Sequence, residues 1–411
     1  MKKLYVGIDV HLKQHVVSIV PFTMFQDNKT GWKKTKSVKM GNNRHDFEYL
    51  DLLLKSQEIS ADQVSIAIDH TGGHYSEPIS YFLKSKGYEV YYLGAASVKA
   101  AKERLLGEEN KTDKIDSATL AYLLYLRDFY NISLNISATS ADFESQSSLL
   151  RSLLLQNQYY RKLGAQTTNR LHQYVHAVFP EGEETYFNQL LAILSTHPTP
   201  KEIISDPDVF KKSRISVKSR KAIRDLAKRT IGVPGQTYKH IIQDLALLRI
   251  SNKVKTLSIE RTIRELVVEH PYSSVLMSFP GVKEKSAAII ISTVKDINNW
   301  PTKKKFKKGL GVYGTIRETG EKHTKFKRGL SGDRMCRQCL FMACFTAVRS
   351  KSNNDFKDFY EGQVRKGKPR IKALVATMGK LAEIMYHCLK LNEPYQYQSL
   401  YNVKPKDCPI L

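Results

Sequence analysis

The sequence predicts an α/β domain at the N-terminus, then a long helical connector and a mainly helical C-terminal domain. Three observations lead to this fold class. Strand patterns alternate with helix patterns over residues 1–137, two long helical stretches occupy residues 138–270, and helix signals with a basic segment fill residues 271–411. With 411 residues the chain is too long for one compact core, and its length favours two or three domains, which these patterns place at the three ranges just given.

In the first domain, apolar segments alternate with amphipathic ones. Strands are predicted at residues 4–9, 15–22, 37–40, 64–69 and 88–93, where Val, Ile and Leu cluster. Helices are predicted at residues 46–56, 77–86, 98–106 and 113–130. The first strands follow one another directly and the later ones are joined through helices. We therefore expect antiparallel strands first and parallel crossovers after them.

The connector begins with a Ser-rich stretch, residues 137–148, which suits a linker. One long helix is predicted over residues 149–178, closed by Pro180, and a second long helix runs to Glu269. The second helix carries an apolar stripe with the 3-4-3 spacing of a coiled-coil seam. The stripe consists of Leu247, Ile250, Val254 and Leu257. Two alternatives stay open: the stripe joins two copies of the chain, or one chain buries it inside a helical hairpin.

The last domain contains two features typical of nucleic-acid binding. The turn at residues 276–282 precedes a helix at residues 286–294, in the manner of a helix-hairpin-helix that directs backbone N–H groups at a phosphate. Residues 303–328 then hold ten Lys or Arg against two Glu. The aromatic residues interleaved with them are Phe306, Tyr313 and Phe326. This pattern favours contact with a nucleic-acid backbone, with a solvated basic face as the alternative.

The charge of the whole chain points to a polyanionic partner. The formal net charge is +25, which an enzyme of small metabolites does not need. The basic residues are spread over the chain and form no interfacial amphipathic helix, so nucleic acid is favoured over a membrane. No apolar run is long enough to span a bilayer, and Asp9 interrupts the apolar N-terminal stretch too early for a signal peptide. We expect a cytoplasmic protein.

Two sets of possible metal ligands are assigned to structural roles. The five cysteines lie in the last quarter of the chain at irregular spacing and form no disulfide framework. Cys336 and Cys339 lack the second pair of a zinc site, and their setting at residues 335–345 predicts a buried helix. His172 and His176 have the spacing of a metal pair, but we expect no acidic partner or third ligand near them and therefore an ordinary helix face.

Four aspartates form the candidate catalytic constellation. Asp9 and Asp69 each end a predicted strand, and Asp113 and Asp116 begin a helix three residues apart, so they face the same way. Four carboxylates on one sheet edge repel one another unless cations neutralise them, which is the logic of a divalent metal site for phosphoryl transfer. The structural alternatives are an N-cap for Asp113 and a turn former for Asp69.

These motifs together resemble a known family. The matching strings are Tyr5–His11, Asp69–Gly72 and Lys111–Ala118, followed in the last third by Phe279–Val282, Gly309–Gly314 and Lys327–Arg334. In order and spacing they resemble the Asp-Glu-Asp-Asp transposases of insertion sequences and the related pilin-gene invertases. The resemblance covers both ends of the chain, and the middle fits the helical connector of that family.

The resemblance implies a RuvC-like RNase H fold for residues 1–137 and Mg²⁺ or Mn²⁺ held by the four aspartates. It also implies DNA strand exchange, with a hydroxyl nucleophile in the C-terminal domain that bonds covalently to a DNA phosphate. Members of the family are guided by a structured RNA encoded by their own element, which pairs with donor and target DNA. Recombination needs several active sites at one junction, so we expect a dimer or tetramer. As a DNA-binding protein it is expected to associate with the bacterial nucleoid.

The sequence departs from the family pattern at two positions. The second acid of the family is Glu, where this chain has Asp69. The reactive Ser of the Ser-Ser-Gly motif aligns with Thr319 in Glu318-Thr319-Gly320. Three interpretations follow: Thr319 is the nucleophile, Ser331 takes its place, or the chemistry is impaired. The structural alternatives are a turn residue for Thr319 and, for Ser331, an N-cap of the helix at residues 335–345.

Seven basic residues are candidates for contact with nucleic acid because they lie beside these motifs. They are Lys13, Lys111, Arg317, Lys325, Lys327, Arg328 and Arg334. Like Lys13, His11 flanks Asp9, within reach of a phosphate. The leading hypothesis is an RNA-guided transposase or recombinase. The alternatives are a RuvC-like metal nuclease that uses water and a nucleic-acid-binding protein with a vestigial site.

Overall fold

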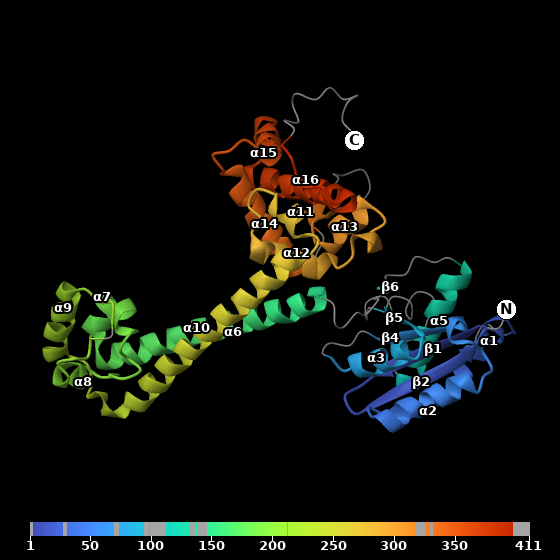
Figure 1. Ribbon diagram of the computed structural model, residues 1–411, viewed down its shortest axis with the longest axis horizontal. Coiled ribbons are helices and arrows are strands. Elements are labelled where there is room, and N and C mark those ends of the chain that lie inside the picture. The colour runs from blue at the N-terminus through green and yellow to red at the C-terminus, as the bar shows by residue number, and fades with distance from the viewer. Residues whose placement is uncertain are drawn as a thin grey trace. The chain divides into compact units, whose positions relative to one another are not determined.

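The structure is a computed structural model (Figure 1). It describes residues 3–27, 31–69, 74–93, 98, 112–130, 136–137, 146–211, 213–317, 325–328 and 332–397. Contacts divide the chain into two compact units, residues 1–145 (unit 1) and residues 146–411 (unit 2). Within the described ranges, no helix combines the length and the apolar character needed to cross a lipid bilayer.

Unit 1 is built on one mixed sheet with the strand order β3-β2-β1-β4-β5-β6. The strands are β1 (Leu4–Val10), β2 (Gln14–Pro21), β3 (Ser37–Gly41), β4 (Val64–Asp69), β5 (Glu89–Leu93) and β6 (Ile136–Ser137). β1, β2 and β3 pair antiparallel, whereas β4 pairs parallel with both β1 and β5. The five predicted strands and their directions are confirmed, and the sheet is compatible with an RNase H-like fold. The short β6, antiparallel to β5, was not predicted.

Helices lie on both faces of this sheet. α2 (Arg44–Lys55) and α3 (Glu77–Ser85) share a core with Leu4, Val6 and Ile8 of β1. α5 (Asp113–Tyr130) packs on the opposite face with Tyr5, because successive side chains of a strand point to opposite faces. Short helices stand at Thr23–Asp27 (α1), Gly31–Lys34 and Ala61–Gln63. Apart from residue 98, the helix expected at residues 98–106 lies outside the described residues.

The contact between β1 and α5 depends on Gly7. A Cβ atom at this position would lie 1.8 Å from the backbone oxygen of Ser117 and 2.8 Å from the backbone nitrogen of Ala121. No side chain fits there, so the helix rests directly on the strand. Beside this point the hydroxyls of Ser18 and Ser117 are hydrogen-bonded at 2.7 Å in a buried position. The position of α5 over β1 is therefore fixed by backbone-to-backbone contact.

Unit 2 consists mainly of helices. They are α6 (Gln146–Val178), α7 (Pro180–Leu190), α8 (Pro200–Ser205), α9 (Val217–Lys228), α10 (Lys239–Glu269), α11 (Ser273–Met277), α12 (Glu284–Val294), α13 (Lys303–Gly309), α14 (Arg334–Val348), α15 (Asp355–Arg365) and α16 (Arg370–Leu391), with 3-10 turns at Gly235–Thr237 and Ile297–Asn299. β7 (Gly314–Arg317) and β8 (Lys325–Arg328) pair antiparallel. The two long helices predicted for the connector are α6 and α10, although α6 begins at Gln146, inside the expected linker.

α6 and α10 run side by side in opposite directions (Figure 1). Asn157 of α6 donates to the backbone oxygen of Thr256 at 3.4 Å, and further along α6 Thr168 accepts from Arg249 at 3.2 Å, so the partner residues descend as the α6 residues ascend. The pair connects two hydrophobic cores of unit 2. One core joins α6 and α10 to α12, α14 and α16, and the other joins them to α7 and α9.

The apolar stripe of α10 is not buried in this hairpin. Leu247, Ile250, Val254 and Leu257 are 50%, 41%, 61% and 56% exposed. The hairpin instead buries other positions of α10, which include Ile242, Ala246 and Val267. The alternative in which a single chain buries the stripe is therefore wrong, because the α6-facing side of α10 is a different one.

We expect Gly7→Ala to lower the free energy of unfolding by about 3 kcal/mol, because a backbone oxygen cannot move away from the new methyl group without displacing α5. Chemical denaturation of the full chain measures this change. The matched control is Gly164→Ala in α6, where nothing lies within 4 Å of the new Cβ. That variant should gain about 1 kcal/mol from helix propensity. A Gly7→Ala protein as stable as the wild type would contradict the close approach.

Candidate functional site

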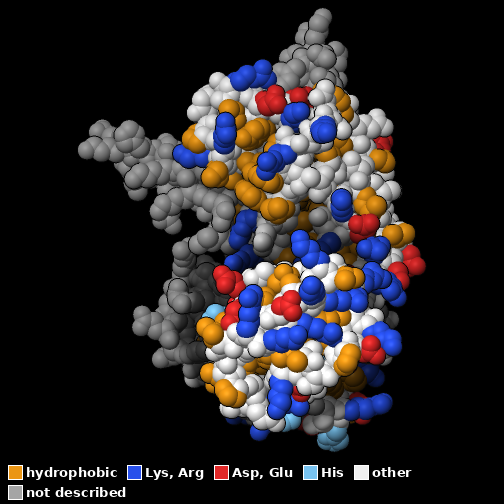
Figure 2. Space-filling view, turned by 90° about the vertical axis from the view of Figure 1, so that its left-hand side faces the viewer, with side chains coloured by type: hydrophobic (Ala, Val, Ile, Leu, Met, Phe, Trp, Pro, Cys, Tyr) orange, Lys and Arg blue, Asp and Glu red, His pale blue; other side chains and the backbone are white. Residues whose placement is uncertain are grey.

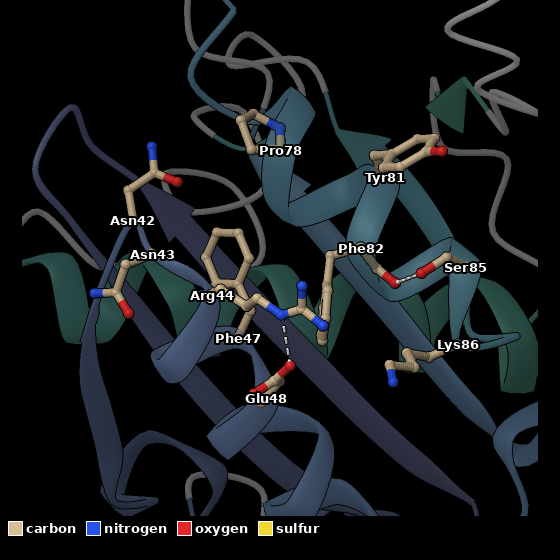
Figure 3. A pocket seen from close by; sticks show the side chains of 10 residues that line it. All are labelled: Asn42, Asn43, Arg44, Phe47, Glu48, Pro78, Tyr81, Phe82, Ser85 and Lys86. Atoms are coloured by element: carbon tan, nitrogen blue, oxygen red, sulfur yellow. Dashed lines mark hydrogen bonds and ion pairs between the residues drawn. The ribbon is translucent and has the colours of Figure 1, made fainter.

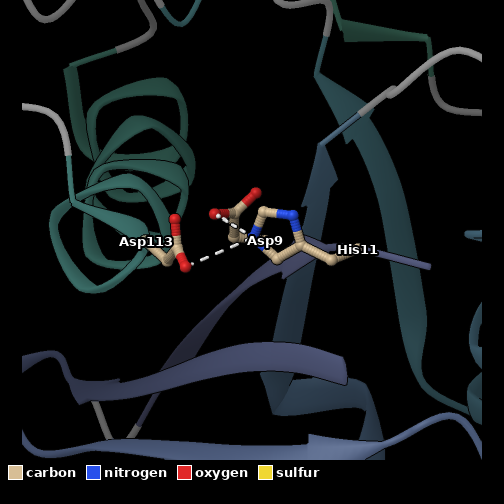
Figure 4. Close-up of side chains that lie close together, drawn as sticks. All are labelled: Asp9, His11 and Asp113. Carbon is tan, nitrogen blue, oxygen red and sulfur yellow. Dashed lines mark ion pairs between the residues drawn. The ribbon is translucent and has the colours of Figure 1, made fainter. Parts of the chain in front are cut away.

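Three side chains converge at the end of β1 (Figure 4). Asp9 is 5% exposed and, with Tyr5 and Gly7, faces α5. The Nε2 atom of His11 lies 3.2 Å from the Oδ2 atom of Asp9 and 3.5 Å from the Oδ2 atom of Asp113, the first residue of α5. One ligand atom from each of the three residues lies within 4.8 Å of the others. These donors can surround a single metal ion.

The surroundings of the Asp9 carboxylate favour a cation beside it. Burial raises the pKa of Asp9, and the nearby charges of Asp113 and Asp69 raise it further, while His11 acts in the opposite direction. The ionised carboxylate is therefore unfavourable without a positive charge beside it. Two carboxylates and an imidazole form a donor set that Mn²⁺ accepts readily, and Mg²⁺ binds through the carboxylates together with water.

The other predicted acids lie around this cluster. Asp69 ends β4, the strand parallel to β1, so both strands deliver a carboxylate to the same sheet edge. Asp116 follows Asp113 by one helical turn on α5 but is not one of the three converging residues. The capping alternative for Asp113 is wrong, because Thr112 accepts the capping hydrogen bond from the backbone N–H of Ile115 at 3.3 Å.

His11 was not among the predicted metal ligands, and from the sequence it was expected only to flank Asp9 within reach of a phosphate. The alternation of a strand would have given the signal, since residues 9 and 11 point to the same side. Lys13 lies exposed in the tight turn that follows, and Lys111 lies outside the described residues.

The predicted nucleophile falls outside the described part of unit 2. Thr319 belongs to residues 318–324, between β7 and β8, and Ser331 to residues 329–331. The N-cap of α14 is Asp333, whose Oδ1 atom accepts from the backbone N–H of Cys336 at 2.6 Å and whose Oδ2 atom pairs with Arg151 at 2.7 Å. The N-cap position proposed as the structural alternative for Ser331 is thus filled by Asp333.

The basic segment of unit 2 combines core and surface residues. Phe306 is fully buried against Trp300 and Tyr386, so it is not a platform on which a base could stack. Lys303 of α13 pairs with Glu383 at 3.0 Å. Four of the predicted contact residues, Arg317, Lys325, Lys327 and Arg328, belong to the β7–β8 hairpin, and Arg334 is exposed at the start of α14.

A second group of possible ligands lies on α6 and α7. The Nδ1 atoms of His172 and His176 lie 2.5 Å and 3.2 Å from the two carboxylate oxygens of Glu183. The expectation that no acidic partner lies nearby was wrong, because the turn after α6 brings Glu183 back beside the helix. Each nitrogen faces a different oxygen, and His172 stacks on the ring of Phe187. This geometry is a hydrogen-bonded clamp between α6 and α7.

The buried helix predicted around Cys336 and Cys339 is confirmed as part of α14. Cys336, Cys339 and Cys344 are free and buried in α14. Burial raises the pKa of Cys339 to about 11 and the pKa of Cys336 well above its usual value. A thiol held protonated in this way is a poor metal ligand and a poor nucleophile.

A shallow pocket elsewhere in unit 1 does not contain the acids. It lies between α2 and α3 and is lined by residues such as Phe47, Tyr81 and Phe82 (Figure 3). Arg44 and Glu48, one helical turn apart on α2, form an ion pair of 2.8 Å at its edge. The pocket sits on the face of the sheet opposite α5, so the Asp9 cluster remains the candidate site.

Comparisons with known proteins assign this arrangement to a family. Residues 6–180 match the family model of the DEDD transposases of the IS110 type, and residues 273–361 match that of the transposase IS116/IS110/IS902 family. The chain is a member of this transposase family. The first match covers all four aspartates, and the second covers the positions of Thr319 and Ser331.

A curated relative supports the same assignment. It is the insertion element IS110 uncharacterized 43.6 kDa protein of Streptomyces coelicolor (strain ATCC BAA-471 / A3(2) / M145), which is 25% identical over 166 residues. The similarity covers 40% of this chain and 40% of the relative. The chain thus matches less than half the length of this relative.

We expect Asp9→Asn to raise the thermal unfolding temperature of the metal-free protein and to abolish its increase on addition of Mg²⁺ or Mn²⁺. The first effect follows because the pKa of Asp9 is raised in the folded state, so ionisation destabilises the metal-free wild type as the pH rises above about 4. The second follows because the variant lacks a charged ligand. Thermal shift assays at several pH values measure both.

The control for this experiment is Asp62→Asn, at an exposed position of unit 1. This variant should leave both the metal-free stability and the response to metal unchanged. A wild type that is not stabilised by either metal would count against a metal site at Asp9.

Proposed function

We propose that the chain is a DNA transposase or recombinase that cleaves and rejoins DNA strands with the help of Mg²⁺ or Mn²⁺. The observation that carries the proposal is the convergence of Asp9, His11 and Asp113 beside Asp69, in a chain of the DEDD transposase family. The net charge of +25 supports a polyanionic substrate.

In this proposal Asp9 and Asp113 are the ligands closest to the metal ion, and Asp69 and Asp116 complete its surroundings. The bound ion would neutralise charge that develops on the phosphate. His11, at the rim of the cluster, is 43% exposed and donates a hydrogen bond to a phosphate oxygen or joins the ligands. Lys13 and Lys111 hold the DNA backbone next to it.

The nucleophile of this proposal is the hydroxyl of Thr319, with Ser331 as the alternative. The oxygen attacks phosphorus, a protein–DNA phosphodiester forms, and the broken P–O bond leaves a deoxyribose hydroxyl that takes up the proton. A hydroxyl of another strand then attacks the same phosphorus and releases the protein. The basic residues around Thr319 in the sequence support this placement, since they can hold a phosphate near the hydroxyl.

The guide in this proposal is a structured RNA encoded by the same element, as the resemblance to the family implies. Its pairing with donor and target DNA would select the sites. The excess of 25 positive charges supports the binding of RNA and DNA together.

We further propose that two copies of the chain associate through the stripe of α10. Its four apolar side chains are each 41% exposed or more, and they repeat with the spacing of a coiled-coil seam. Burying them against the same residues of a second copy would remove this apolar surface from water. Association also provides the several active sites that strand exchange requires.

We expect active wild-type protein, incubated with Mg²⁺, guide RNA and DNA, to yield a DNA-linked protein species on denaturing gels. Thr319→Ala should abolish this species because it removes the attacking oxygen, and Thr319→Ser should restore it. Ser331→Ala is the matched control and should leave the species in place. Asp9→Asn should lower its amount by at least about a hundredfold, because the charge on the phosphate is no longer neutralised.

The alternative functions predict different outcomes of the same experiment. Hydrolysis products without a DNA-linked species, unaffected by Thr319→Ala, would support a nuclease that uses water. A linked species that survives Thr319→Ala and disappears in Ser331→Ala would move the nucleophile to Ser331. Binding without any chemistry in wild type and variants would support a vestigial site.

We expect Val254→Glu combined with Leu257→Glu to shift the protein toward monomer, because two charges cannot be buried at a symmetric seam. Sedimentation equilibrium measures the shift. The control is Leu248→Glu, at a position on α10 that is 42% exposed but outside the 3-4-3 repeat, and it should leave the oligomeric state unchanged. An unchanged distribution in the double variant would exclude this seam.

A further inference from the structure

A strongly basic face lies on α9, far along the sequence from every motif discussed above. Residues 211–229 contain nine Lys or Arg and one acid, Asp225. They belong to the part of unit 2 formed by α7, α8 and α9, at the left of Figure 1. Figure 2 looks onto this end, and Lys and Arg side chains gather in its lower half.

One side of α9 is apolar and buried, and the other is basic and exposed. Ile223 and Ala227 are buried in the core formed with α6, α7 and α10. Lys218, Lys221 and Lys228 are exposed. Because they are three and seven residues apart, they share the side of the helix opposite to Ile223 and Ala227. Asp225 is the single acid among them. Since the apolar side is already covered, α9 cannot insert it into a lipid surface.

The exposed cations of α9 differ from the arginines that stabilise the fold. Arg220 donates to the backbone oxygens of Ile215 and Ser213 at 2.8 Å and 3.1 Å. Arg224 donates to the backbone oxygen of Asp206 at 3.0 Å and lies over the ring of Phe210. By contrast, none of the three exposed lysines forms an ion pair with any residue in the described part of the chain.

Four acids of this region are already engaged with other groups. Glu181 accepts from the hydroxyl of Thr230 at 2.6 Å and from the backbone N–H of Ile231. Glu183 lies in the clamp with His172 and His176 described above. The next two acids are also paired: Glu202 with Lys239, and Asp206 with His197. On α9 itself, Asp225 is then the one acid against three exposed lysines.

We propose that the exposed face of α9 binds the phosphodiester backbone of a nucleic acid without reading its sequence. The three lysines span ten residues, about 15 Å of helix, which matches roughly four phosphates of one strand at 3.4 Å of rise each. Lysine ammonium groups bind phosphates as point charges and carry no base specificity. The inference rests on the proposed function only in that the protein handles nucleic acid.

The test compares two triple variants of the full chain. Lys218→Gln/Lys221→Gln/Lys228→Gln removes the face, and Lys351→Gln/Lys366→Gln/Lys372→Gln removes the same charge from exposed positions elsewhere in unit 2. Binding to a DNA duplex and to an RNA duplex of arbitrary sequence is measured at several salt concentrations. The α9 variant should lose about 2.7 from the slope of log affinity against log salt, from three lost contacts at about 0.9 each.

Each outcome decides a different point. A loss of slope with only one of the two duplexes assigns the face to DNA or to RNA. An equal loss in both triple variants would show an effect of net charge and overturn the proposal. No loss in the α9 variant would also overturn it, while the DNA-linked species of the wild type would keep the proposed function intact. A wild type that binds neither duplex would instead refute the proposed function.

Discussion

The direct contact between β1 and α5 is the constraint on which the candidate site depends. Gly7 lets the backbone of the helix rest on the strand, and two residues further along the same face of β1 stands Asp9. Asp113 is the first residue of α5, the helix that packs against Gly7, so its carboxylate lies close to the end of β1. Parallel pairing of β1 and β4 brings Asp69 to the same edge. The geometry of the candidate metal site thus depends on the absence of a side chain at Gly7.

The sequence allowed most of unit 1 to be predicted, because its strands are short apolar runs and its acids end them. The positions of Asp9 and Asp69 followed from that pattern. Other features depend on tertiary contacts that no local pattern encodes. Examples are the capping of α5 by Thr112, the return of Glu183 to His172, and the burial of Phe306, which looked in the sequence like a stacking residue. The exposure of the α10 stripe likewise depends on which side of α10 faces α6.

In unit 2, some charged side chains form contacts that stabilise the fold, whereas others are exposed and can bind a partner. Arginines and acids near α9 bond to backbone oxygens, histidines and hydroxyls, and Lys303 is paired with Glu383. Each such contact neutralises or directs a charge that would otherwise face solvent. The three exposed lysines of α9 lie outside these contacts and share one side of the helix, although the sequence spreads basic residues along the whole chain. Composition alone gives the total charge, whereas the fold decides where that charge can act.

Because α6 and α10 pair antiparallel and contribute to both hydrophobic cores of unit 2, the length of this helix pair sets the distance between the cores. The chain leaves one core along α6, forms the second core with α7 and α9, and returns along α10. Deleting seven residues from each helix would shorten this spacer by about 10 Å and keep the apolar repeat in phase. The path of the chain through each hydrophobic core would stay the same. The distance between the two cores thus changes with the length of two paired helices, and the cores themselves stay intact.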